Sequence, residues 1–186
     1  MPKIWYTSDL HFYHTNICLH TDRKKVVPQE DHDIWLIDLW NSQVSKHDLV
    51  YQLGDFVFNC RNLETWQSVV SRLNGRIIHI KGNHDSSDVL KRSGHEWYDL
   101  KRVKVGKQHI VLCHFALRVW DMYHHGAWHL YGHSHGNLPS AGRSIDVGID
   151  NAYNVFGEHR FFTMDDLREL IGSKDVILHD HHKLKE

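Results

Sequence analysis

Ile4-Trp5-Tyr6-Thr7-Ser8-Asp9, at positions 4–9, is a short apolar run that passes directly into polar residues. Such a run predicts a buried strand whose carboxyl end carries Asp9. Apolar residues then recur at helical spacing between positions 34 and 44, and Leu49-Val50-Tyr51-Gln52-Leu53 predicts a second strand that ends at Gly54-Asp55. Strand, helix and strand in this order predict a β-α-β unit.

The same pattern continues downstream. Residues 63–73 have helical spacing, and Ile77-Ile78-His79-Ile80 predicts a strand that runs into the polar segment 81–85. Further strands are predicted at 103–105, 110–112, 130–131 and 145–147, followed by a last helix at 164–171. We therefore expect an α/β fold with two sheets, partly parallel and partly antiparallel, flanked by helices.

Length and composition indicate one domain at 1–175, followed by a charged tail at 176–186 that contains His179, His181 and His182. The net charge of -1 gives no reason to expect strong binding to duplex nucleic acid. Three widely spaced cysteines indicate reduced thiols. Because no long apolar stretch is found at the N-terminus or elsewhere, we expect a cytoplasmic protein without a membrane segment; the sequence does not indicate its oligomeric state.

Polar side chains follow the predicted strands. Asp9-x-His11 is weak evidence alone, because a chain with 19 histidines produces this pair by chance, and Gly54-Asp55 is a common strand ending. Gly82-Asn83-His84-Asp85 is more specific, since glycine permits a sharp turn and the next three side chains offer an amide oxygen, an imidazole and a carboxylate. The other interpretation of this segment is a simple Asn/Asp turn.

Two further histidine positions extend the set. Gly132-His133-Ser134-His135 places imidazoles two residues apart, which can serve two neighbouring metal ions, although a chance pair would look the same. His114 follows the predicted strand 110–112, where a lone histidine is more often a half-buried structural residue than a ligand. Only the five elements together indicate a metal centre.

Their order, D-x-H, G-D, G-N-H-D, H and G-H-x-H over residues 9–135, resembles the calcineurin-like metallophosphoesterase superfamily. The opening segment 8–17 is similar to its small bacterial and phage branch, and the segment 146–150 adds to the similarity. Many members carry Asp or Asn three residues after the G-D aspartate, where this chain has Phe58. The resemblance implies one metal held by Asp9, His11 and His135, a second held by Asn83, His114 and His133, and Asp55 as the bridge between them.

The chemistry requires such a set independently. Two cations roughly 3.5–4 Å apart need an anionic bridge, and together they lower the pKa of a bridging water so that hydroxide attacks phosphorus in line. Imidazole, carboxylate and amide ligands suit Mn, Fe, Co, Ni or Zn better than Mg or Ca, and the resemblance favours Mn. His84 is the expected proton donor, with Asp85 favouring its protonated form. Arg23, in a basic run, is a candidate for binding substrate phosphate, or else solvated surface.

The predicted function is a two-metal phosphodiesterase, active also on monoesters, with small nucleotide-like substrates. A nuclease that acts on nucleic-acid ends is the enzymatic alternative, although such relatives carry extra domains. A non-catalytic metal-binding scaffold, similar to the retromer subunit of this fold, is the alternative from another class. A scaffold would be expected to lose ligands, and none is missing from this sequence.

Overall fold

Strand β1 (Ile4–Thr7) lies inside a five-stranded sheet in the computed structural model, which describes residues 2–176. It pairs in parallel with β2 (Leu49–Gln52), which pairs in parallel with β3 (Arg76–Ile80). Strand β4 (Trp97–Tyr98) extends this parallel part, and β9 (Phe162–Thr163) pairs antiparallel with β1. The order is β4-β3-β2-β1-β9, and the predicted β-α-β unit is confirmed.

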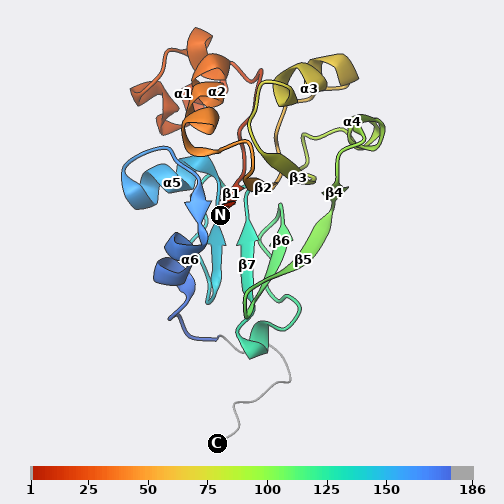
Figure 1. The fold of residues 1–186 in the computed structure, drawn as a ribbon. Coiled ribbons are helices and arrows are strands. Elements are labelled where there is room, and N and C mark those ends of the chain that lie inside the picture. Colours follow the sequence, from red (N-terminus) through yellow and green to blue (C-terminus); the bar gives the residue numbers. More distant parts are fainter. Residues whose placement is uncertain (1, 177–186) are drawn as a thin grey trace, which may run out of the picture.

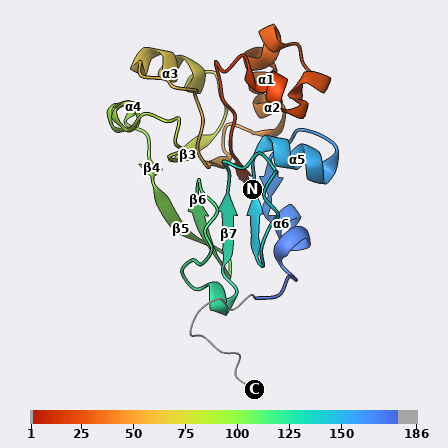
Figure 2. The same cartoon turned by 180° about the vertical axis from the view of Figure 1, so that it is seen from behind.

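The second sheet has the order β5-β6-β7-β8. Strands β5 (Leu100–Val105) and β6 (Gln108–Cys113) form an antiparallel hairpin, whereas β7 (Trp128–Tyr131) and β8 (Ser144–Asp146) continue the sheet in parallel. Figures 1 and 2 show helices α2 (His32–Gln43) and α3 (Leu63–Val70) beyond the first sheet, on the side away from strands β5 to β7. The predicted fold class, two mixed sheets flanked by helices, is confirmed.

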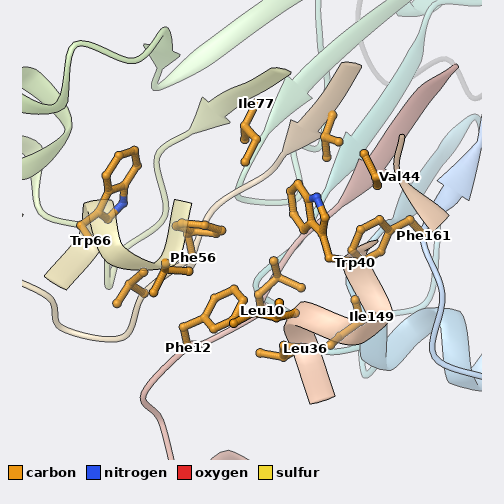
Figure 3. Close-up of a cluster of buried hydrophobic side chains, with 14 of the residues drawn as sticks. Leu10, Phe12, Leu36, Trp40, Val44, Phe56, Trp66, Ile77, Ile149 and Phe161 are labelled. Atoms are coloured by element: carbon orange, nitrogen blue, oxygen red, sulfur yellow. The ribbon is translucent and has the colours of Figure 1, made fainter. Parts of the chain in front are cut away.

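The alternation of side chains along β1, β2 and β3 explains why the first sheet is covered on both faces. Trp5, Val50 and Ile77 lie opposite one another in register, and all three belong to one buried cluster. Successive strand residues point to opposite faces, so these three side chains share the outer face of the sheet. Figure 3 shows Ile77 in this cluster with Trp40 of α2 and Trp66 of α3.

Their neighbours Tyr6, Tyr51 and Ile78 therefore face the second sheet. They pack in another buried cluster that includes Leu112 of β6 and Leu130 of β7, so this core lies between the two sheets.

The helices are α1 (Ile17–His20), α2 (His32–Gln43), α3 (Leu63–Val70), α4 (Ser87–Ser93), α5 (Ile149–Phe156) and α6 (Met164–Ile171), with short 3-10 turns η1 (Asp22–Lys25), η2 (Gln29–Asp31) and η3 (Tyr123–His125).

Helix α6 begins and ends where the sequence predicts. Thr163 and Asp166 form a capping box at its first turn, which explains where it begins.

Cys18, Cys60 and Cys113 are free thiols, as predicted. Within residues 2–176 no helix has the length and apolar character needed to cross a membrane. From position 177 onward, the predicted tail with its histidines lies outside the described residues.

The loops that follow the parallel strands meet at one edge of the two sheets. A bridge between Ser8 and Gly148 joins the loop after β1 to the loop after β8, and a bridge between Phe12 and Val57 joins it to the loop after β2. Ligands of α/β sheets bind at the carboxyl ends of strands. The predicted metal ligands, with His84 and Asp85, lie in loops of this kind, whereas Arg23 lies in η1.

Candidate metal centre

Two groups of potential ligands come together at this edge. Asp9, His11 and His135 offer ligand atoms that all lie within 4.8 Å of one another. The same holds for Asp55, His114 and His133. The loops after β1 and β7 build the first group, and the loops after β2, β6 and β7 build the second. These are two compact sites of mixed carboxylate and imidazole donors, as transition-metal ions require.

Asp55, a member of the second group, also lies close to the first. Its Oδ2 atom is 3.7 Å from Nε2 of His11 in the first group and 3.6 Å from Nε2 of His114 in the second. Asn83 completes the second group, because its Oδ1 atom lies 3.0 Å from Nε2 of His114 and 3.0 Å from Nδ1 of His133. The structure thus brings all seven predicted ligands together, and their division between two metals stays a prediction.

The backbone of this centre is strained. Asp9, His11, Asp55, His133 and His135 all have positive φ angles, between 47° and 67°. Residues other than glycine rarely adopt this conformation, and each such residue costs of the order of 1–3 kcal/mol. Strain of this kind is typical of functional sites, where the surrounding structure holds a residue in an unfavourable conformation.

Close packing of the loops leaves no room for a side chain at Gly82. A Cβ atom at this position would lie 2.2 Å from Oδ1 of Asp55 and 2.4 Å from its backbone nitrogen. The glycine of the G-N-H-D segment is therefore needed because its backbone lies directly against Asp55, in addition to permitting a turn.

Hydrogen bonds on the far side of two imidazoles fix which nitrogen faces the centre. Nδ1 of His114 donates to the carbonyl oxygen of Leu53 at 2.7 Å, and Nδ1 of His135 donates to Oδ2 of Asp150 at 2.7 Å. Their Nε2 atoms remain for a metal, an arrangement common among metal-binding histidines. Asp150 is a site residue that sequence reasoning did not assign, although the segment 146–150 belongs to the resemblance.

Arg23 does not have the environment expected of a phosphate-binding residue. Its side chain is fully buried, and its guanidinium donates to both carboxylate oxygens of Asp150, from Nε at 2.9 Å and from Nη2 at 2.8 Å. It also donates to the carbonyl oxygens of Leu10 at 2.8 Å and Asp9 at 2.5 Å. The prediction for Arg23 is therefore revised: the guanidinium holds Asp150 and the loop of Asp9, and is not accessible to a substrate.

The electrostatics of the centre favour cations. Burial raises the pKa of Asp9 to about 7 and lowers the pKa of His11 to about 2. Burial also opposes ionisation of Asp55, but the adjacent His114 outweighs it and holds the Asp55 pKa at about 2. Nδ1 of His11 is buried without a hydrogen-bond partner in the described chain. Burial opposes protonation of His114, but the carboxylates of Asp55 and Asp9 outweigh it and raise the His114 pKa to about 9. Buried carboxylates and imidazoles that hold protons between them are the donor set in which a pair of transition-metal ions can replace those protons.

His84 and Asp85 have different environments. The His84 ring is half-buried near Phe58, at 4.8 Å between ring centroids, and its Nδ1 lies 3.4 Å from Oδ1 of Asn59. The Asp85 carboxylate accepts hydrogen bonds from the backbone N–H groups of Asp55, Phe56 and Gly82 at 2.8–3.0 Å. No hydrogen bond joins Asp85 to the His84 ring in the described chain, so Asn59, which the sequence did not single out, is the polar residue that faces His84.

Comparison with known proteins gives relatives over most of the chain, although no family model matches the sequence. The gene 66 protein of Mycobacterium phage D29 is 29% identical over 203 residues, which cover 92% of this chain and 96% of the phage protein. The uncharacterized protein MJ1445 of Methanocaldococcus jannaschii is 30% identical over 161 residues, covering 81% of this chain and 83% of the archaeal protein.

A solved structure has the same fold. The protein of unknown function AQ665 from Aquifex aeolicus superposes with a TM-score of 0.66 at 20% sequence identity. The match covers 92% of this chain and 100% of the Aquifex chain. The arrangement of two mixed sheets is therefore that of an experimentally determined fold.

Proposed function

We propose that this chain, which belongs to one family with the archaeal protein MJ1445, is a two-metal phosphodiesterase of the calcineurin-like metallophosphoesterase superfamily, with small nucleotide-like substrates. One observation carries the proposal: the Asp55 carboxylate lies 3.7 Å from the His11 imidazole and 3.6 Å from the His114 imidazole. This position supports a bridging role for Asp55.

Each group would hold one ion. Asp9, His11 and His135 would bind the first, and Asn83, His114 and His133 the second. When bound, the two cations neutralise phosphoryl charge and lower the pKa of a water for in-line attack. The donor set suits Mn, Fe, Co, Ni or Zn, and Mn²⁺ is the ion to test first.

His84 is the candidate proton donor to the leaving oxygen. Its backbone N–H donates to Oδ1 of Asp55 at 2.9 Å, so the residue is tied to the proposed bridge. Its side chain is partly exposed, and Asn59 faces Nδ1. If Asn59 holds Nδ1, the other ring nitrogen is free to donate a proton to the substrate. Asp85 would act through the backbone that carries Asp55 and Gly82, and not by contact with His84.

An exposed aromatic ring beside the second group supports a nucleotide-like substrate. Phe115 is 46% exposed, and its ring centroid lies 4.8 Å from that of His133. An exposed phenyl ring next to a catalytic centre is a surface on which a nucleobase can stack.

A substrate panel tests the proposed function. Protein reconstituted with Mn²⁺ is assayed with bis-p-nitrophenyl phosphate, p-nitrophenyl phosphate, 2′,3′-cyclic nucleotides and single-stranded DNA. We expect the diesters to be hydrolysed faster than the monoester, with loss of activity in Asp55→Asn. The matched control is Asp88→Asn, which changes an exposed carboxylate on α4 that pairs with Arg92. Hydrolysis of the monoester alone would contradict the diesterase, and an active Asp55→Asn would contradict the bridge.

A further inference from the structure

A cavity of about 230 Å³ opens beside the first metal group. His135 belongs to both the group and the cavity wall. The other walls come from the end of α1 and from η1, from the loop after β7, and from helix α5. The lining residues are His20, Thr21, Asp22, Lys24, His135, Asn137, Asp150 and Asn154. Every one of them is polar, and none is Phe, Tyr or Trp.

The charges in the cavity leave one cation without a partner. The Asp22 carboxylate pairs with Lys25 at 3.0 Å, and the Asp150 carboxylate is held by Arg23 and His135. The ammonium group of Lys24 is exposed and makes no ion pair or hydrogen bond within residues 2–176. The cavity therefore presents one free positive charge, while both of its carboxylates are neutralised.

Two amide side chains add neutral donors. The side chains of Asn137 and Asn154 are exposed and make no hydrogen bond in the described part of the chain. An ammonium group and amide N–H groups around one space are the donors that hold a phosphate group. The rings in the lining are the imidazoles of His20 and His135, and His135 is a proposed metal ligand, whereas the exposed phenyl ring of Phe115 is not part of this lining.

The walls of the cavity are fixed by buried contacts. The fully buried Arg23, next to Lys24 in the chain, fastens the η1 segment to Asp150 of α5 through two hydrogen bonds. On the other side, the backbone of Gly136 lies against α5, where a Cβ atom would be 2.3 Å from Nδ2 of Asn154 and 3.2 Å from Cα of Asn151. Both walls are thus anchored on α5, and the cavity is pre-formed.

We infer that this cavity is a subsite for a second phosphate group of the substrate, bound by Lys24 with Asn137 and Asn154 while the scissile diester lies at the metal centre. The inference rests on the proposed function. It narrows the substrate class to phosphodiesters that carry another phosphate, such as nucleotide esters with a phosphate at a second position and short oligonucleotides.

A matched pair of substrates tests the subsite. Thymidine 5′-(p-nitrophenyl phosphate) is compared with the same ester carrying a 3′-phosphate, so that the leaving group and nucleoside are identical. We expect the wild-type KM to be about tenfold lower for the 3′-phosphorylated ester, because a charge-assisted hydrogen bond contributes about this factor. Lys24→Ala should remove most of that difference, Lys24→Arg should keep it, and neither should alter kcat for the simpler ester by more than about twofold.

Binding without turnover provides a second readout. Calorimetric titration of the metal-loaded protein with thymidine 3′,5′-bisphosphate should show weaker binding in Lys24→Ala, and unchanged binding in Lys91→Ala, an exposed lysine of α4. Equal KM values for the two esters, or equal losses on both in Lys24→Ala, would overturn the subsite and leave the proposed function intact. Failure to hydrolyse either ester would overturn the proposed function, and the subsite with it.

Discussion

We assign His84 to the chemical step and not to metal binding. We expect His84→Gln to retain both metals, because Asn83 supplies the ligand of this segment, and to lower kcat by roughly 10²–10⁴. Esters with basic alkyl leaving groups need a proton most, so their hydrolysis should lose more than that of p-nitrophenyl esters. Metal analysis and kcat for both ester types measure this.

Equal losses on both ester types would assign His84 to the stabilisation of phosphoryl charge instead. Loss of metal from His84→Gln would show that His84 contributes to metal binding, and would contradict its role as a proton donor. His95→Gln is the matched control, because His95 packs against Trp66 and His79, away from the ligands.

Asp150 connects the metal centre to a buried ion pair. Asp150→Asn should weaken metal binding about 10–100-fold, since the carboxylate holds Nδ1 of His135. The same change leaves the buried Arg23 without its charge partner, which should cost about 3–5 kcal/mol of unfolding free energy. Metal titration and urea denaturation measure the two effects.

The control for that variant is Asp121→Asn, because the pair of Asp121 with Arg102 is exposed and should contribute less than about 1 kcal/mol. If Asp150→Asn bound metal and unfolded like the wild type, the contact of Asp150 with His135 would not contribute to metal affinity, and its pair with Arg23 would not contribute to the unfolding free energy.

The identity of the candidate ligands could be predicted from the sequence, but their conformation and burial could not, and neither could the roles of Asp150 and Asn59. The motif order identified all seven candidate ligands, whereas nothing in it indicates that five of them have positive φ. Arg23 was interpreted as accessible because its neighbours Lys24 and Lys25 are charged. Its burial depends on Asp150, 127 positions away, and no local pattern reports such a partner.

At the scale of elements, Asp48 joins the beginnings of β1 and β2. Its carboxylate accepts hydrogen bonds from the backbone nitrogens of Lys3 at 2.8 Å and Ser45 at 2.9 Å, and from Nε1 of Trp5 at 3.0 Å. Burial opposes its ionisation, but these donors outweigh burial and hold the Asp48 pKa well below its usual range. A depressed folded-state pKa stabilises the protein above the unfolded pKa of about 3.9 and loses this effect as the pH falls below it.

Asp48→Ala should therefore lower the unfolding free energy by about 1–3 kcal/mol at pH 7, and the gap to the wild type should narrow as the pH falls below about 4. Urea denaturation of both proteins at pH 7 and pH 3.5 measures the gap. A gap of the same size at both pH values would show that the stabilisation does not depend on the ionised carboxylate.

Elements with strong periodicity were predicted well, and short ones were missed. The segments 63–73 and 164–171 correspond to α3 and α6 because apolar residues recur at helical spacing. Helix α5 was missed because Gly148 gives it no side-chain cap, whereas α3 and α6, of the same length, are capped by Asn62 and Thr163. Strands β4 and β9 have two residues each, so their pairing with β3 and β1 is set by tertiary contacts and not by a local pattern.

At the scale of the whole molecule, the candidate centre straddles the two sheets. Asp9, Asp55 and Asn83 follow strands of the first sheet, whereas His114 and His133 follow strands of the second. The core between the sheets therefore sets the distance between the two halves of each ligand group. The sequence predicted two sheets, but not which strands lie side by side, because strand order depends on packing between residues far apart in the chain.

Metal content measured together with activity tests the two-metal centre most directly. Protein stripped by a chelator and reconstituted with Mn²⁺ should contain two ions per chain by elemental analysis. Hydrolysis of bis-p-nitrophenyl phosphate should disappear on chelation, return with the metal, and be lost together with metal in Asp55→Asn. Full turnover by a metal-free chain, or by a chain that holds a single ion, would contradict this account.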